Sequence, residues 1–312
     1  MKLYVGVTDN NWFHFLAERQ PDEVNFWRPG GGSFRAIPEG APFLFKLHSP
    51  HNYIVGGGFF VQYSLLPISL AWAAFEQKNG APDFEAFRQK ILGYRSSKAP
   101  TTPDPQIGCL VLVEPFFFAR EDWIPIPDDW SSGIRRGKTY DTSDPSGERL
   151  WQAVQERLPR YERPPGWKDS ADVGVVESPR YGDEYLIRPR LGQGAFRVLV
   201  TEAYTRRCAM TGERTLPALV AAHIKAYGKS GPHRVDNGLL LRADLHMLLD
   251  QGYLTLTKKY HIEVSRRIKE EFENGQEYYA LHGRPLAILP QQEFERPSPE
   301  FIEWHNEQVF SE

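Results

Sequence analysis

The chain has 312 residues, of which 41% are hydrophobic and 25% charged, and its formal net charge is −3. This length and hydrophobic content suffice for a substantial core and favour two domains over one. The nearly balanced charge gives no overall case for nucleic-acid binding, which normally shows as an excess of Lys and Arg, so any such case must come from local charge.

Membrane insertion, secretion and cysteine chemistry are not expected. No apolar run reaches the roughly 18 residues needed to cross a bilayer, and MKLYVGVTDNNW at the start lacks the zones of a signal peptide. The two cysteines, Cys109 and Cys208, are too few for a disulfide framework or a four-cysteine zinc site and fit a reducing compartment. We therefore expect a cytoplasmic protein with no membrane partner.

Residues 1–158 indicate a mixed, mostly β module with inserted helices. Residues 2–9 are typical of a strand, and Asp9 or Asn10 can cap a helix over 11–20. Glycines 56–58 suggest a bulge or a close backbone approach within a strand. Further strands are predicted at 41–50, 52–67 and 106–118, and further helices at 68–80, 83–95 and 147–158.

The second half begins with a linker. Proline, glycine and charged residues crowd residues 159–185, which we assign to that linker. A second domain is predicted over 186–290, and GQGAFRVLVTEAYTRRC within it has the apolar spacing of a helix. Residues 291–312 are predicted to form a surface-attached tail.

A cluster of arginines lies between residues 186 and 214. The planar guanidinium suits phosphate, and only Glu202 and Glu213 oppose this charge. A solvated helix face explains such a cluster equally well. Its members are Arg188, Arg190, Arg197, Arg206, Arg207 and Arg214.

The stretch from 218 to 252 predicts a β-β-α unit. ALVAAHI is a strand ending at His223, NGLLL is a second strand beginning at Asn237, and ADLHMLLDQG is a short helix. Because His246 and Asp250 are four residues apart on this helix, their side chains lie on one face and can hold a single cation. His223 is expected to face the same point. In the loop between the strands, we interpret His233 as a surface or phosphate-contacting residue.

These residues resemble the HNH (β-β-α-metal) endonuclease family. His223, Asn237 and His246 stand at the family's spacing of fourteen and then nine residues, and Asp250 matches a further metal ligand four residues on. The resemblance extends over roughly residues 195–257, and its YTRRCAMTGE is similar to the leading hairpin of many members. It implies an endonuclease that hydrolyses phosphodiester bonds of DNA with a divalent metal.

The resemblance also implies a role for each residue. His223 would be the general base, since a neutral imidazole can take a proton from water at cellular pH. Mg²⁺, with Mn²⁺ or another divalent ion as alternatives, would be held by His246 and Asp250, with Asp244 as a further candidate ligand. Asn237 would hold the connecting loop and orient the base. The arginines would bind flanking phosphates.

Two features depart from the family pattern. Ala222 stands where many members have an Asp or His as another metal ligand, although Mg²⁺ tolerates few protein ligands and many waters. Cys208 is followed by Thr211 where a second cysteine would stand, and Arg242 and Leu245 occupy the places of a later cysteine pair. We therefore expect no structural zinc.

The N-terminal module is similar, more loosely, to the PUA superfamily of small β-barrels, which includes the EVE, ASCH and SRA-like readers of modified nucleic acid. The likeness lies in the order of KLYVGVTD, VNFWRPGGGSF, GAPFLFKLHSPHNYIVGGGFF and IGCLVLVEPFFF. It implies an α+β chain with a PUA-like β-barrel before the HNH domain. Such readers hold a flipped base in a pocket, for which Trp12, Phe26, Trp27 and Arg28 are candidates. Core or barrel-rim packing explains each of them equally well.

A modified-base reader fused to an HNH nuclease resembles a modification-dependent, type IV restriction endonuclease, which cuts double-stranded DNA carrying modified cytosine in antiphage defence. Cutting both strands requires two active sites, which favours a homodimer. Two alternatives stay open. In one, the N-terminal domain recognises something other than a modified base, such as an RNA or an antiphage partner. In the other, the nuclease is inactive and the chain only binds nucleic acid, for which Ala222 is the best argument.

Overall fold

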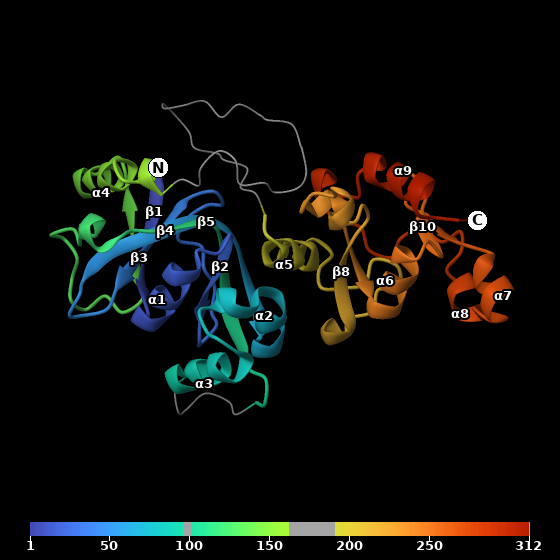
Figure 1. Cartoon of the computed structure of the whole chain (residues 1–312), viewed down its shortest axis with the longest axis horizontal. Coiled ribbons are helices and arrows are strands. Elements are labelled where there is room, and N and C mark those ends of the chain that lie inside the picture. The colour runs from blue at the N-terminus through green and yellow to red at the C-terminus, as the bar shows by residue number, and fades with distance from the viewer. Residues whose placement is uncertain (96–101, 162–190, 312) are drawn as a thin grey trace. The chain divides into compact units, whose positions relative to one another are not determined.

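The computed structural model describes residues 1–95, 102–161 and 191–311, which fall into two compact units (Figure 1). Within these residues, unit 1 covers 1–161 and 191–195, and unit 2 covers 196–311. Most of the predicted linker lies outside the described residues, as do Arg188 and Arg190. None of the described helices has the length and apolar character needed to span a membrane.

Unit 1 is built on a mixed seven-stranded sheet. Its strands follow the order β2-β5-β4-β3-β1-β7, and β6 pairs with β4. The β1–β3 pair is parallel, and the other described pairs are antiparallel. The strands are β1 (Lys2–Thr8), β2 (Glu23–Arg28), β3 (Pro42–Leu47), β4 (Tyr53–Pro67), β5 (Gln106–Phe117), β6 (Ile124–Pro125) and β7 (Gly137–Asp141).

This sheet curls around an aromatic core. Four strand-to-strand steps separate β2 from β1, which in a flat sheet would be roughly 19 Å. Yet the Phe26 ring of β2 lies 4.7 Å, centroid to centroid, from the Phe43 ring of β3 and approaches Gly6 of β1 within side-chain contact. The sheet is therefore barrel-like, as expected. Its interior is filled by Trp12, Phe13, Leu16, Val24, Phe34, Phe43, Phe45, Phe60, Leu110 and Phe117.

Glycines 56–58 of β4 lie where the sequence predicts a bulge or a close backbone approach. The pairing of β4 with β5 shifts register between Gly57 and Phe59, which marks a bulge or irregularity. A side chain at Gly56 would place its Cβ 2.2 Å from the carbonyl oxygen of Phe116 on β5. Both the irregular pairing and the close backbone approach are therefore present.

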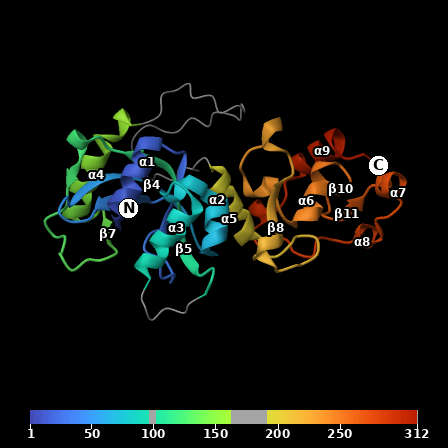
Figure 2. The same cartoon turned by 60° about the horizontal axis from the view of Figure 1, so that its bottom comes forward.

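Four α-helices flank the sheet of unit 1 within the described residues (Figures 1 and 2). Asp9 caps the first of them, because its Oδ1 accepts a hydrogen bond of 2.8 Å from the Trp12 amide. Asp83 caps the third in the same way through the amide of Ala86. The helices are α1 (Asn10–Arg19), α2 (Ile68–Phe75), α3 (Phe84–Tyr94) and α4 (Pro145–Gln155).

Strand β2 has no counterpart among the predicted elements. It carries Glu23 and Asn25, residue types that are depleted in strands. Both side chains are fully buried but bonded: Lys78 donates to the Glu23 carboxylate at 2.9 Å, and Asn25 Nδ2 donates to Asn79 Oδ1 at 2.9 Å. Partners more than fifty residues away therefore permit a strand that local propensity disfavours.

Unit 2 contains the predicted β-β-α unit. Strand β8 (Leu219–His223) pairs antiparallel with β9 (Gly238–Arg242), and α6 (Ala243–Asp250) follows β9 directly. Helix α5 (Gln193–Ala203) precedes them, and its first three residues are grouped with unit 1. The remaining elements are β10 (Leu254–Leu256), β11 (Ile262–Val264), α7 (Arg267–Phe272), α8 (Gln276–Tyr279) and α9 (Pro299–Gln308).

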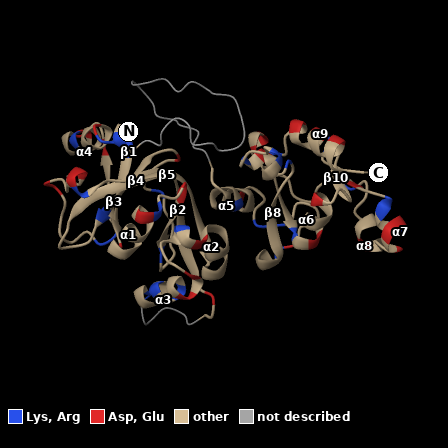
Figure 3. Ribbon diagram, viewed as in Figure 1, with Lys and Arg blue, Asp and Glu red and all other residues tan. Residues whose placement is uncertain are grey.

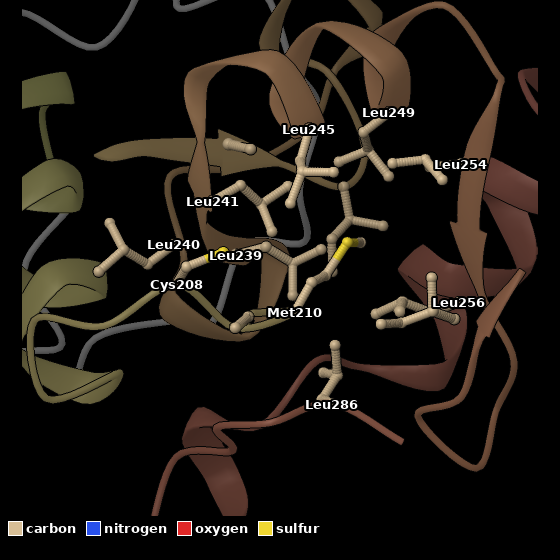
Figure 4. Packing of buried hydrophobic residues seen from close by; sticks show 14 of the residues in the cluster. Cys208, Met210, Leu239, Leu240, Leu241, Leu245, Leu249, Leu254, Leu256 and Leu286 are labelled. Carbon is tan, nitrogen blue, oxygen red and sulfur yellow. The ribbon is translucent and has the colours of Figure 1, made fainter. Parts of the chain in front are cut away.

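The core of unit 2 is mainly aliphatic. Figure 4 shows leucines of β9, α6 and β10 packed around Cys208 and Met210. The labelled leucines are Leu239, Leu240, Leu241, Leu245, Leu249, Leu254, Leu256 and Leu286. Residue Cys208 is a free, buried thiol within this cluster.

The predicted tail over 291–312 is wrong. These residues contain α9, whose Phe301 and Ile302 belong to the core of unit 2. His305 of the same helix is 2% exposed and bonds to Thr255 of β10 and to the carbonyl of Leu249. Proline and charged residues suggest a surface segment, but the apolar face of α9 closes the core.

Candidate functional site

The β8–β9 hairpin and α6 form the frame of the candidate site. His223 ends β8 and pairs with Gly238, the first residue of β9. A Cβ on Gly238 would lie 2.5 Å from a methyl carbon of Val200 on α5, so glycine lets the helix pack closely against the strand. Close packing of α5 brings Phe196 of that helix beside His223.

Asn237 holds the loop that joins the two strands. Its fully buried side chain accepts a hydrogen bond from the Lys225 amide at 2.9 Å. Its Nδ2 donates to the carbonyl oxygens of Lys225 and Pro232, each at 3.0 Å. Its own carbonyl accepts from the amide of Ile224, the residue after His223. The asparagine therefore ties both ends of the loop together.

His223 lies in a half-buried aromatic setting. The Phe196 ring stacks on its imidazole with centroids 3.9 Å apart and planes 12° from parallel. Burial, reinforced by the charges of His233 and His246 and opposed by Asp250, lowers the pKa of His223 to about 4. The imidazole is therefore neutral at cellular pH, which is the state that can accept a proton.

His246 and Asp250 lie one turn apart on α6 with their functional atoms together. The Nε2 of His246 is 3.1 Å from Oδ2 of Asp250, and the two side chains are 27% and 54% exposed. His223 ends β8, and α6 follows the partner strand β9 directly. That His223 faces the His246–Asp250 pair stays a prediction.

The His246–Asp250 pair suits a divalent cation in the number and kind of its donors. Imidazole nitrogen and carboxylate oxygen both bind such ions, and Mg²⁺ commonly uses one or two protein ligands with water and phosphate oxygens. No group of three or more His, Cys, Asp or Glu side chains within the residues that the structure describes is arranged to hold a metal. His246 and Asp250 would be the protein donors to a cation bound here.

Asp244 is not brought to this pair. Arg242 donates to both of its carboxylate oxygens, at 3.0 and 2.6 Å, and the Tyr278 hydroxyl approaches at 3.4 Å. Residues two apart on a helix point to different faces, so Asp244 and His246 diverge. The candidate helper ligand is instead engaged by an arginine.

The described part of the arginine cluster is partly neutralised. Arg206 pairs with Glu202 one turn earlier on the chain at 2.6 Å. Burial lowers the pKa of the Arg197 guanidinium on α5, and Arg207 donates weakly to the Gly212 carbonyl at 3.4 Å. Figure 3 shows basic and acidic residues interspersed along the ribbon. Phosphate binding by the cluster stays a prediction.

Of the four candidate pocket residues of unit 1, Phe26, Trp27 and Arg28 belong to β2, and Trp12 of α1 packs against one face of that strand. Trp12 is 3% exposed and packs against Phe26, with ring centroids 5.5 Å apart. Arg28 lies on the same face, where it donates to the Tyr4 hydroxyl at 3.1 Å. Trp27 points the other way, and its indole donates to the Asn79 carbonyl at 2.9 Å. The structure thus brings three of the four together, and a modified-base pocket stays a prediction.

Sequence reasoning missed the surroundings of His223. The sequence indicates only a surface or phosphate-contacting role for His233, whereas its Nδ1 lies 3.0 Å from Nε2 of His223. Tyr227 stacks on His233, with the two ring centroids 4.4 Å apart. No sequence pattern indicates this contact, because it depends on the path of the connection that Asn237 holds through Lys225 and Pro232.

Comparisons with known proteins match this part of the chain to a family. Residues 208–257 match the model of the HNH endonuclease family. No curated protein matches the chain significantly. A point mutant of an ASCH protein from Zymomonas mobilis is 8% identical with a TM-score of 0.34, covering 52% of this chain and 99% of that one. The modification-dependent TagI restriction endonuclease is 14% identical with a TM-score of 0.27, covering 92% and 75%. Unit 2 of this chain contains an HNH endonuclease domain.

Proposed function

We propose that the chain is a metal-dependent DNA endonuclease, and that unit 2 hydrolyses the phosphodiester bond. The observation that carries the proposal is the His246–Asp250 pair, with Nε2 and Oδ2 3.1 Å apart, on the helix that directly follows the β8–β9 hairpin bearing His223. A base and a pair of metal donors are the two components that attack by water on a charged phosphodiester requires. The HNH family match over residues 208–257 supports the same chemistry.

Each residue has a defined part in the proposed reaction. His223 removes a proton from the attacking water, and burial keeps its imidazole unprotonated beforehand. His246 and Asp250 hold the divalent cation, which when bound supplies positive charge to the phosphate and the leaving oxygen. Asn237 keeps the loop closed around the base through its bonds to Lys225 and Pro232.

The nuclease proposal is tested with supercoiled plasmid, purified full-length protein, and Mg²⁺ or Mn²⁺ in separate reactions. We expect nicked or linear product with at least one of the two metals and none with a chelator. His223→Ala should lower the rate by about 10²–10⁴-fold, the usual contribution of general base catalysis. His14→Ala, which removes an exposed histidine of unit 1, is the matched control. A preparation in which His223→Ala cuts as fast as the wild type contradicts the proposed base.

Modified cytosine is the proposed target, and unit 1 is the proposed reader. Support comes from its barrel-like sheet, from the aromatic residues lining the face of β2 that carries Arg28, and from the likeness of its sequence to modified-base readers. The indole Nε1 of Trp12 is buried and has no partner within the residues that the structure describes.

A binding measurement distinguishes modified cytosine from the alternative targets. Duplexes that differ at one cytosine, unmodified, 5-methylated or 5-hydroxymethylated, are titrated with protein in a chelator so that no cutting occurs. Tighter binding of a modified duplex supports the reader. Equal affinity for all three duplexes, in a protein that cuts DNA, favours an HNH nuclease whose unit 1 recognises something else. Binding without cutting in any metal favours the inactive nucleic-acid-binding protein.

Cutting of both DNA strands requires two active sites, which leads to a proposal about the number of chains that act together. One HNH site serves one strand at a time, so we expect two copies of the chain to act together on a duplex. Sedimentation with and without a modified duplex measures this directly, and a linear product formed by a strictly monomeric protein contradicts it.

A further inference from the structure

We propose that His233 is a positioning residue that fixes the tautomer and ring orientation of His223, so that Nδ1 of His223 is the nitrogen that takes the proton. This inference rests on the proposed function of His223 as the base. It goes further by assigning a role to a histidine outside the His223, Asn237 and His246 constellation, and by assigning the two ring nitrogens of the base.

Contacts on both sides hold the two imidazoles in place. His223 is stacked by Phe196, and the Nε2 of His223 meets Nδ1 of His233 at 3.0 Å. His233 is stacked in turn by Tyr227, whose plane lies 12° from parallel. The two histidines therefore form a bonded pair between two aromatic rings.

The buried Asn237 supports both members of the pair. Its backbone carbonyl accepts from the amide of Ile224, which follows His223 in the chain. Its side chain donates to the carbonyl of Pro232, which precedes His233. One fully buried residue thus fixes the backbone next to each imidazole, so the Nε2–Nδ1 contact is not a chance meeting of exposed side chains.

The number of protons on the two rings allows only one arrangement in which His223 keeps a free nitrogen. Two neutral imidazoles can share a hydrogen bond only if one nitrogen carries a proton and the other is bare. If His223 Nε2–H donates to His233 Nδ1, then Nδ1 of His223 is bare and can accept a proton. In the reverse arrangement the bare nitrogen of His223 is Nε2, and the bond to His233 already occupies it.

The selected arrangement also suits the product of proton transfer. When an O–H bond of water breaks and an Nδ1–H bond forms, His223 becomes an imidazolium with a proton on each nitrogen. Its Nε2–H still donates to the neutral His233, so the hydrogen bond persists and strengthens as charge develops. Neutral His233 is required here, and a protonated His233 would oppose the positive charge on His223, in line with its effect on the His223 pKa.

The tautomer can be measured without any cutting. Full-length protein labelled with ¹⁵N-histidine is studied by NMR at pH 7 without metal, and the resonances of His223 are assigned by comparison with His223→Ala. We expect His223 to carry its proton on Nε2 and to be bare at Nδ1. A proton on Nδ1 overturns the inference, whether or not the preparation has nuclease activity.

Two substitutions separate positioning from mere packing. His233→Phe keeps a flat ring between His223 and Tyr227 but removes the acceptor, whereas His233→Asn places Oδ1 where Nδ1 stood. Partners that orient functional histidines at metal sites are worth about 10–100-fold in activity, and we expect a loss of that order in kcat for His233→Phe with KM unchanged. His233→Asn should recover activity to within about threefold of the wild type.

The remaining outcomes are distinct from failure of the proposed function. Wild-type rates for His233→Phe, beside an inactive His223→Ala, overturn positioning and leave the nuclease proposal intact. Equal losses in His233→Phe and His233→Asn, at unchanged melting temperature, assign His233 a structural part only and also overturn the inference. If the wild-type protein cuts nothing, the nuclease proposal fails, and the NMR tautomer alone decides whether His233 positions His223.

Discussion

The buried asparagine of the β8–β9 hairpin and the buried polar residues of β2 bond to partners at very different distances along the chain. In unit 2, Asn237 bonds to Lys225 and Pro232, which are 12 and 5 residues away. In unit 1, Glu23 and Asn25 bond to partners 55 and 54 residues away. The polar contacts of Asn237 are therefore local, whereas those of β2 form only once the distant segment around Lys78 and Asn79 has packed against it.

This difference predicts how each unit responds to change. A local site is organised by one hairpin and one helix, so single substitutions there should alter rate or the stability of a small region. A framework built across distant elements couples each polar contact to the whole sheet. We expect unit 1 substitutions to affect the choice of DNA without removing the cutting chemistry, and unit 2 substitutions to do the reverse.

The largest expected effect comes from the proposed metal donors. His246→Ala and Asp250→Ala each remove one of the two protein ligands, so a hundredfold or greater loss of cutting is expected, about 2.7 kcal/mol in activation free energy. Titration of Mn²⁺ against rate should show weaker apparent affinity for both variants. The Arg19→Ala variant, on an exposed position of α1, serves as the control. Unchanged metal dependence would place the cation elsewhere.

A second prediction compares a buried asparagine of each unit. Asn237→Ala removes three side-chain hydrogen bonds to backbone groups, so we expect the free energy of unfolding to fall by about 2–3 kcal/mol. Asn25→Ala removes a side chain whose Oδ1 has no partner within the described residues, and a loss nearer to about 1 kcal/mol is expected. Urea unfolding followed by fluorescence measures both. Equal losses contradict the difference expected from the three bonds of Asn237 and the unpaired Oδ1 of Asn25.

A third prediction concerns acid. Burial, opposed by the bond to the Leu249 carbonyl and by Asp250, lowers the pKa of His305, and burial likewise lowers that of His223 to about 4. Because the unfolded chain then binds more protons than the folded one, stability of unit 2 should be complete above about pH 6.5 and fall as the pH drops below that value. Urea midpoints between pH 7 and pH 4.5 test this. His305→Gln should flatten part of the slope, and an unchanged slope contradicts the assignment.

The smallest expected effect is on selection by unit 1. Arg28 lies over the Phe34 ring and bonds to Tyr4 on the face that carries Phe26. If this face reads the base, Arg28→Ala should weaken binding of a modified duplex by about 1–2 kcal/mol while the rate on saturating DNA stays near that of the wild type. Loss of affinity for modified and unmodified duplexes alike would indicate a general phosphate contact instead.

Spacing on one helix and one hairpin made the site predictable from sequence. His246 and Asp250 are four residues apart, and helical geometry alone brings their side chains together. The end of β8 at His223 follows from the strand pattern, which places the start of the next strand at Asn237, one residue before β9 begins. The His223–His233 bond could not be predicted in this way, because it depends on the path of the connection between the strands that Asn237 closes.

Long-range contacts explain the parts of the fold that sequence did not predict. The polar residues of β2 do not predict a strand from sequence. The partners that allow their burial lie on a distant turn around Lys78 and Asn79. The charged and proline-rich segment before α9 suggests a tail, but Phe301 and Ile302 are buried in the core of unit 2. The separation of Trp27 from Trp12 depends on side-chain alternation along β2, which was not recognised as a strand.

The most direct test of the account is the ratio of cutting rates on matched plasmids. One plasmid preparation carries 5-methylcytosine or 5-hydroxymethylcytosine and the other is unmodified, and both are cut by excess full-length protein with saturating Mn²⁺. We expect a much faster rate on the modified plasmid, abolished on both by His223→Ala. Equal rates on all plasmids would contradict reading of these bases by unit 1 while leaving unit 2 as the nuclease.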